Sequence, residues 1–298
     1  MYLELKHARV LLHILYQSIQ DAQNITGPAS SSSSSSSSTS KNTFACYLFL
    51  LLTGLRKAYL VDCYAPSYHQ VLHILREVKH RCAQDLQLQE IDFSMQELVV
   101  IHMDNVVLLV EYEHWKEVAL TTSPYVVDIS NDLPILVNSQ EMESLMDCIY
   151  SFAISNVSEG LYFVDVKVDE MLFSPLQLYP LLSGHYLGYP ICYNFMSNAT
   201  STANALSMQP LRRLSYRVSI PELAPEQPLL GDIDLIEYTC PVIILENYAH
   251  VLKRVESSII ETKQTVNSSF QRNRLKDSFP AMTLNICDSI VTLHNPVI

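Results

Sequence analysis

Residues 98–112 read LVVIHMDNVVLLVEY, and this stretch decides the class of fold. Two runs of β-branched and aliphatic residues are separated by Asp104-Asn105, a pair that favours a tight turn. The pattern predicts a β-hairpin, although Asn-Gly would be a stronger turn signal. Residues 117–121 and 125–129 are also rich in strand-forming types, so we expect them to continue the sheet as a meander.

Segments with helical periodicity lie on both sides of this hairpin. Residues 57–63 predict a strand, and Pro66 then opens a helix that runs to about Cys82. Asn138 and Glu141 form a capping pattern at the start of another helix. Further strands are expected at residues 161–168, 189–196, 214–220 and 283–293, and further helices at 2–23, 178–187 and 242–269. Together these elements predict an α+β fold, a mixed and largely antiparallel sheet with helices packed on its faces.

The last of these helices carries an apolar seam with 4-3 spacing. Its members are Tyr248, Leu252, Val255, Ile259, Thr262 and Val266. The spacing suits a coiled-coil partner, and it also suits a helix that docks on a sheet of its own chain. We favour the second interpretation.

Composition divides the chain into three parts. Residues 1–24 are expected to form an amphipathic helix. Residues 25–41 contain an unbroken serine run, 30–38, and are expected to be a disordered linker because such a tract buries no apolar surface. Residues 42–298 are expected to fold as a single globular domain. Whether the first helix docks on that domain is left open by the sequence.

The chain is acidic, with a formal net charge of −12, and 48% of its residues are hydrophobic against 17% charged. It can therefore bury a sizeable core, whereas its charge disfavours binding to the phosphates of a nucleic acid. Residues 253–276 are locally basic, which we interpret as the charged side of a helix. The most apolar run, 44–52, is shorter than the ~20 residues of a bilayer span, so we expect a core segment and no membrane contact.

Seven cysteines are scattered along the chain without a C-x-x-C pair. An odd, dispersed set is typical of reduced thiols and predicts a cytoplasmic or nuclear protein. A cysteine nucleophile needs a histidine base close by, which makes Cys63, beside Asp62, and Cys192, after His185, the candidates. A buried, unreactive thiol is the alternative at both positions.

General catalytic signatures are missing from the sequence. The six glycines form neither a G-x-G-x-x-G pattern nor a P-loop, and no G-x-S-x-G, H-E-x-x-H or EF-hand pattern occurs. The sequence therefore indicates no particular cofactor, and it leaves open whether the protein is an enzyme.

Three segments share the form aromatic-apolar-Val-Asp and end at Asp62, Asp128 and Asp165. If their strands were parallel neighbours, three carboxylates would meet at one edge of the sheet, where open α/β sheets bind ligands. Such a cluster could bind Mg²⁺ or act as acid and base, and Asp62 is the strongest candidate because a strand-to-helix turn follows it. The alternative is that each Asp is an ordinary turn former.

A stripe of metal-binding residue types follows one face of the helix that Pro66 opens. Its members are His69, His73, Glu77 and His80. Histidines four residues apart on a helix can chelate a divalent ion. Because the apolar residues of this helix lie on nearly the opposite side, the stripe is expected to face solvent. A solvated polar face is therefore the alternative to a metal site.

Two blocks of the sequence carry a family resemblance. Residues 50–62 read LLLTGLRKAYLVD, and residues 181–193 read LLSGHYLGYPICY. Together they resemble an animal family, the homologues of the human chromosome 1 open-reading-frame 74 protein, over most of the chain from about residue 42. The resemblance implies no activity, cofactor or catalytic residue. In physical terms, Gly184 and Gly188 predict a helix cap that leads directly into a strand.

These observations predict a non-enzymatic intracellular protein that acts through protein contacts. The first helix and the 4-3 seam of the last helix are the expected contact surfaces, with a protein as partner and neither nucleic acid nor membrane. The alternative is a metal- or small-ligand-binding enzyme that uses the strand-end carboxylates Asp62 and Asp128.

Overall fold

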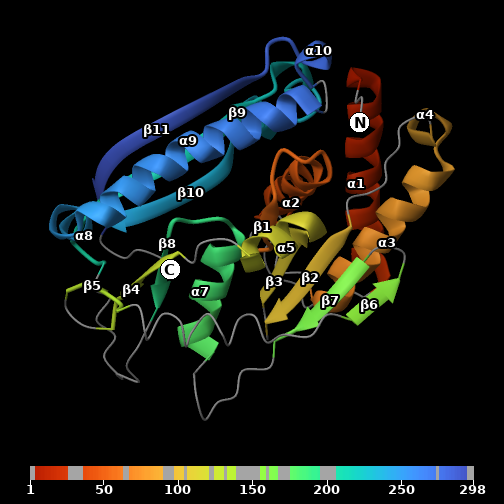
Figure 1. Ribbon diagram of the computed structural model, residues 1–298. Coiled ribbons are helices and arrows are strands. Elements are labelled where there is room, and N and C mark those ends of the chain that lie inside the picture. Colours follow the sequence, from red (N-terminus) through yellow and green to blue (C-terminus); the bar gives the residue numbers. More distant parts are fainter. Residues whose placement is uncertain are drawn as a thin grey trace.

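Helices cover both faces of a five-stranded sheet in the computed structural model of the chain (Figure 1). The structure describes residues 4–25, 36–62, 67–89, 97–103, 106–120, 124–130, 133–138, 155–158, 161–166, 175–194, 206–272 and 275–293. The strand order of the five-stranded sheet is β1 (Ala58–Leu60), β3 (Val106–Glu111), β2 (Leu98–Met103), β7 (Leu161–Asp165) and β6 (Ser155–Ser158). Strand β7 is parallel to β2, and the other pairings of this sheet are antiparallel.

The predicted hairpin is confirmed, and both of its faces are buried. Strands β2 and β3 pair antiparallel, with Ile101 opposite Leu108. Alternate residues of each strand enter different hydrophobic clusters, because successive side chains of a strand point to opposite faces. Leu98 and Val100 belong to the cluster on one face, and Val99 belongs to the cluster on the other.

The cluster on the first face is built largely by the N-terminal helices. These are α1 (Leu5–Ile25), α2 (Ser36–Leu52), α3 (Tyr68–Gln84) and the short α4 (Leu86–Gln89). Helix α1 packs against α2 and α3, and Leu11 and Leu15 on its inner face are fully buried. Arg81 of α3 also forms an ion pair with Asp21 of α1, with 2.5 Å between Nη2 and Oδ2. The first helix therefore docks, a point that the sequence left open.

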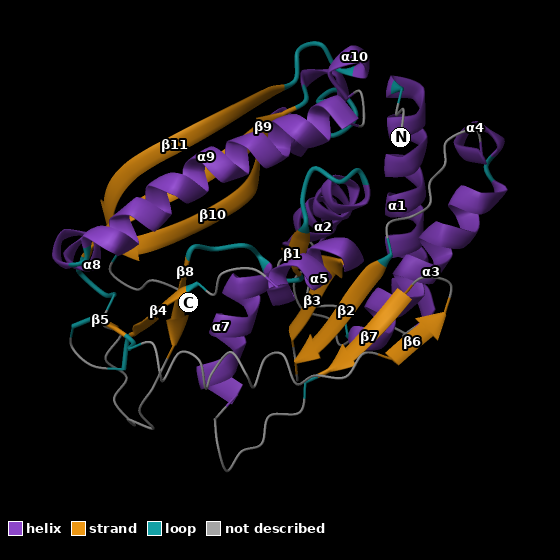
Figure 2. Ribbon diagram, viewed as in Figure 1, coloured by secondary structure: helices purple, strands orange, loops and turns teal. Residues whose placement is uncertain are grey.

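The cluster on the second face is covered by α5 (Tyr112–Leu120) and α7 (Pro175–Tyr186) (Figure 2). Next to them lies a small sheet of β5 (Ile135–Leu136), β4 (Tyr125–Asp128) and β8 (Ile191–Asn194). Strand β4 is parallel to β8 and antiparallel to β5.

A third sheet and a long helix complete the fold. Strand β9 (Pro210–Ser219) lies between β10 (Ile233–Pro241) and β11 (Thr283–Thr292), and both pairings are antiparallel. Helix α9 (Ala249–Arg272) lies along this sheet (Figure 1). Four shorter elements connect them: the 3-10 turns 221–223 and 228–231, α8 (Val242–Asn247) and α10 (Leu275–Ser278). The α+β class predicted from the sequence is therefore confirmed.

The seam of α9 is occupied by its own chain. Val255 and Val266 are buried, and Leu252 and Ile259 are partly buried against the same hydrophobic cluster. The apolar faces of α1 and α9, which the sequence offered as contact surfaces, are thus used inside the fold. No helix within the described segments is long and apolar enough to cross a membrane.

Several boundaries differ from the sequence-based expectations. The predicted strand at 117–121 is wrong, because helix α5 follows directly on β3 and buries Val118 instead. Strand β4 consequently joins the small sheet and does not continue the hairpin. The predicted helix 242–269 is interrupted at Tyr248, whose φ of −129° is not helical. Helix α2 begins at Ser36, inside the range expected to be a linker.

Strand β10 was missed because its alternation is broken. The register between β9 and β10 shifts between Asp234 and Ile236, so a bulge puts consecutive residues out of phase. The pattern of one apolar residue in two is lost at that point. The helix expected to start with the capping pattern of Asn138 and Glu141 lies outside the described residues, except for Asn138 itself.

A methyl group added at Gly184 is expected to destabilise the protein by about 1–3 kcal/mol through overpacking. The Cβ of Gly184→Ala would lie 2.7 Å from Sγ of Cys192. Urea unfolding followed by circular dichroism measures the change in the free energy of unfolding. The double variant Gly184→Ala/Cys192→Ala should be more stable than the sum of the two single effects. Gly231→Ala is the control, because its Cβ would meet Ala224 at an ordinary 3.5 Å; equal losses at both glycines would contradict the prediction.

Candidate functional site

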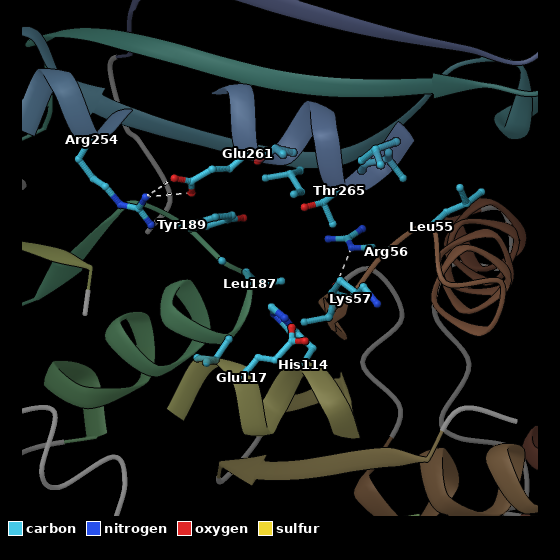
Figure 3. A pocket seen from close by; sticks show the side chains of 17 residues that line it. Leu55, Arg56, Lys57, His114, Glu117, Leu187, Tyr189, Arg254, Glu261 and Thr265 are labelled. Carbon is cyan, nitrogen blue, oxygen red and sulfur yellow. Dashed lines mark hydrogen bonds and ion pairs between the residues drawn. The ribbon is translucent and has the colours of Figure 1, made fainter. Parts of the chain in front are cut away.

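A cavity of about 320 Å³ lies between α9 and β10 on one side and the start of β1, helix α5 and the end of α7 on the other (Figure 3). Its wall is formed by residues 55–58 after α2, His114, Glu117 and Val118 of α5, residues 187–189 after α7, Leu235 and Ile236 of β10, and Arg254, Glu261, Thr262, Thr265 and Val266 of α9. Leucine and valine side chains alternate in this wall with charged groups and hydroxyls. Such a combination of apolar surface and a few polar groups is typical of small-ligand sites.

Two helix ends bring the chain to the cavity. Gly54, just after α2, has φ of 71°, and Gly188, just after α7, has φ of 78°. Glycine adopts this left-handed backbone without strain, so both residues end a helix and turn the chain sharply. The N–H of Tyr189 donates to Gly184 O over 2.9 Å, which confirms the cap predicted in this block. The residues that follow each turn, 55–58 and 187–189, line the cavity.

Arg56 is held in place by stacking. Its guanidinium carbon lies 4.5 Å from the ring centroid of Tyr47 and 5.2 Å from that of Tyr59. Its Nε donates to Ala58 O over 2.8 Å. Its Nη1 is buried and has no hydrogen-bond partner among the described residues. A buried donor without a partner carries a desolvation cost, so an acceptor brought to Nη1 would be stabilising.

The other two cations of the cavity already have carboxylate partners. Lys57 forms an ion pair with Glu111, which is 8% exposed. Arg254 contacts both oxygens of Glu261 at 2.9 Å. Glu117, by contrast, is exposed at the wall of the cavity and forms no ion pair with the described residues. Arg56 and Glu117 are therefore the two charges of the wall that the described chain leaves unmatched.

Two histidines lie close together here: His114 is half-buried in the wall, and His185 next to it is buried. Nε2 of His114 is 3.0 Å from Tyr186 O; since a carbonyl only accepts, Nε2 donates and Nδ1 keeps its lone pair. Burial lowers the pKa of His114, and the nearby Lys57 cation lowers it further. Burial also lowers the pKa of His185 to about 4, with a smaller contribution from His114. Both rings are consequently neutral at neutral pH.

The structure does not bring the three predicted carboxylates together. Asp128 ends β4 in the small sheet, and its Oδ1 accepts hydrogen bonds from Ser130 N and Oγ at 2.9 and 2.5 Å, as a turn former does. Asp62 follows β1 and Asp165 ends β7; these strands point the same way but are separated by β3 and β2. Three inter-strand spacings put the two strands roughly 14 Å apart. Oδ1 of Asp165 instead faces Nδ1 of His102 at 3.3 Å.

The histidine stripe of α3 lies on the outer side of that helix, as the sequence indicated. His69 and His80 are exposed, and His73 and Glu77 are half-buried. Glu77 is engaged by Arg81 at 2.7 Å, and His80 contacts Gln84 at 2.9 Å. Within the described part of the chain, no three His, Cys, Asp or Glu side chains converge as ligands of one metal ion. Metal binding by this stripe stays a prediction.

The cysteines of the described residues are free and mostly buried. Burial raises the pKa of Cys192, and it raises the pKa of Cys82 and Cys240 to about 12. These thiols are therefore protonated at neutral pH, which disfavours a nucleophilic role for Cys192. Cys63 lies outside the described residues.

The cavity residues themselves were not found from the sequence. Arg56 and Lys57 follow the helix-ending Gly54, which is a visible local signal for a turn that presents two cations. His114 and Glu117 lie in a segment whose helix was mistaken in part for a strand. No spacing pattern links these positions to α9, since they meet only through the packing of distant segments.

The fold defines an α+β protein, and the wall of its cavity carries charges of both signs. The chain belongs to the family described as Domain of unknown function (DUF4504), whose model matches residues 28–286. No curated protein and no solved structure matches the chain. Both blocks that carry the family resemblance, 50–62 and 181–193, contribute residues to the cavity.

The stability of the protein is expected to fall as the pH is lowered from 6.5 to about 4. In this window the unfolded chain protonates His185, whose ordinary pKa is 6.5, while the folded chain keeps it neutral. The unfolded state therefore binds more protons, and the free energy of unfolding falls by up to ~1.4 kcal/mol per pH unit for one histidine. Above pH 6.5 this contribution is constant. Burial of His114 acts in the same direction.

Urea unfolding between pH 4.5 and 7.5 tests this dependence. His185→Gln removes the titrating group and should flatten the slope. His69→Gln, at the exposed start of α3, should leave it unchanged. An unaltered slope in His185→Gln would show that other groups produce it.

Proposed function

We propose that the protein binds a small organic molecule in the cavity beside Arg56, through an anionic group of that molecule. The observation that carries the proposal is Arg56 in the wall of the cavity, because it forms no ion pair with the described residues and its Nη1 has no hydrogen-bond partner among them. The stacking on Tyr47 and Tyr59 fixes the plane of the guanidinium before any ligand arrives. A preorganised fork of this kind is suited to carboxylates and phosphates.

The proposal keeps the ligand-binding alternative drawn from the sequence and moves it to other residues. Asp62 and Asp128 lie in different sheets or next to them, whereas Arg56 lies in the cavity with Thr265 of α9 facing it (Figure 3). The apolar part of the wall, which includes Leu187 and Val118, would exclude water from the bound group and strengthen its contact with the cation.

Two further statements belong to the proposal. An intracellular location, cytoplasmic or nuclear, is supported by the free thiols of the described chain. Membership among the homologues of the human chromosome 1 open-reading-frame 74 protein is supported by the two blocks at 50–62 and 181–193.

A thermal-shift screen of the full chain against carboxylates, phosphate esters and divalent metals tests the binding proposal. A ligand at 100 times its Kd stabilises the folded state by ~2.7 kcal/mol, a shift of several degrees in Tm. Arg56→Gln should weaken the binding of a carboxylate or phosphate ester about tenfold or more, because one charge-assisted hydrogen bond is lost. The effect of Arg56→Gln is measured as the rise in Tm that the ligand causes in the variant. The Tm of the unliganded variant is not used, because Arg56 also supports the fold.

Arg76→Gln is the matched control for this experiment. It removes the same charge from an exposed position on α3, away from the cavity. Equal weakening in the two variants would mean that overall charge, and not the Arg56 fork, determines binding. A panel without any anion that binds would overturn the proposal.

Protein contact remains a second candidate, favoured by one observation on β11. This ten-residue strand forms an edge of its sheet among the described strands, and its register with β9 has no bulge. Ile290 is 69% exposed on it. The strand has neither lysine nor proline, the residues that usually protect an edge from pairing. We propose an extended, basic segment of another protein as the partner, since the chain itself carries a net charge of −12.

Ile290→Lys is expected to abolish such strand addition while Tm stays within about a degree, because an edge lysine opposes pairing and the side chain is exposed. Ile260→Lys is the matched control, being the same change at a position 59% exposed on α9. Binding of basic peptides, measured by fluorescence anisotropy, should be lost in the first variant and kept in the second. If both variants lost peptide binding, or if both kept it, β11 would not be the contact site.

A further inference from the structure

The charges of the cavity wall leave one positive and one negative group to be matched. Five charged residues line it: Arg56, Lys57, Glu117, Arg254 and Glu261. Lys57 is paired with Glu111 below the wall, and Arg254 with Glu261 within it. Two charged residues of the wall have no ion-pair partner among the described residues. They are Arg56, whose Nη1 is buried, and Glu117, which is exposed. A purely anionic ligand would satisfy the first and be repelled by the second.

The two unmatched groups come from different sides of the cavity. Arg56 precedes β1, whereas Glu117 belongs to α5, one helical turn beyond His114 (Figure 3). His114 adds no charge there, because Nε2–H is committed to the carbonyl of Tyr186 and the ring is neutral. The other groups near the two charges are Lys57, which is paired with Glu111, and apolar side chains, among them Val118 and Leu187.

We propose that the ligand is a zwitterion, with its carboxylate on Arg56 and its ammonium group at Glu117. This inference rests on the proposed function and adds the class of ligand to it. Both unmatched charges then gain an opposite partner, and the ligand carries no net charge. A neutral ligand is not repelled at long range by a chain of net charge −12, which an anion would be.

The size and lining of the cavity further restrict which zwitterions could bind. A volume of about 320 Å³ is at the small end of the range for ligand pockets. Leu187, Val118 and Leu235 supply an apolar wall for a hydrocarbon substituent. The features together fit an α-amino acid with an apolar side chain, or a molecule of the same size and charge pattern.

Isothermal titration of the full chain with free amino acids and their matched analogues tests this class. The probes are alanine, valine, leucine, isoleucine, methionine and phenylalanine, each with the carboxylic acid that lacks the amino group and the amine that lacks the carboxylate. At least one amino acid should bind about tenfold more tightly than both of its analogues, as one charge-assisted hydrogen bond at each end requires.

Glu117→Gln should bring the affinity for that amino acid down to the affinity for its carboxylic acid analogue. The affinity for the analogue itself should stay equal or increase, since a repulsive carboxylate has been removed. Glu113→Gln is the matched control, because Glu113 lies on the same helix, exposed and paired with Lys116, and does not line the cavity. Its affinities should equal those of the unmodified chain.

The outcomes separate the two proposals. If carboxylic acids or phosphate esters bind as well as amino acids, and Glu117→Gln changes neither, the zwitterion inference is overturned while the anion site at Arg56 stands. Binding of other anions without any amino acid has the same meaning. If no probe binds, or if binding is insensitive to Arg56→Gln, the proposed function is overturned and the inference with it.

Discussion

Strands β2 and β3 leave neither of their faces to solvent, and the rest of the structure depends on this constraint. Their residues are apolar at almost every position, and successive side chains point to opposite faces of the sheet. Both faces must therefore be buried against other elements. Helices α1, α2 and α3 provide it on one face, and α5 and α7 on the other. The chain must therefore cross from one face of the sheet to the other, and these crossings create the places where distant segments meet.

The cavity arises at such a meeting. Gly54 and Gly188 end their helices in the left-handed conformation, and each turn delivers the next few residues to the same space under α9. Close packing holds the second turn: within α7, Gly184 lies so close to Cys192 that an added Cβ would have no room.

Electrostatics give that space its chemical character. Lys57 is neutralised by a nearly buried carboxylate, and His114 and His185 are kept neutral by burial. Arg56 is different, because two tyrosines and the carbonyl of Ala58 hold it without an ion pair to the described chain. A cation that is positioned but not neutralised is suited to recognition, and for that reason the function proposed for the protein is centred on this residue.

The sequence by itself determined the local features of this protein. It predicted the α+β class, the hairpin at 98–112, the inward face of α3 and the cap at Gly188, because periodicity, capping and turn chemistry act over a few residues. Tertiary structure alone decided which strands became neighbours. It separated Asp62 from Asp165 by two intervening strands, and it buried the face of α1 that the sequence left open. The cavity followed from packing between segments more than a hundred residues apart, and no local pattern encodes contacts at that separation.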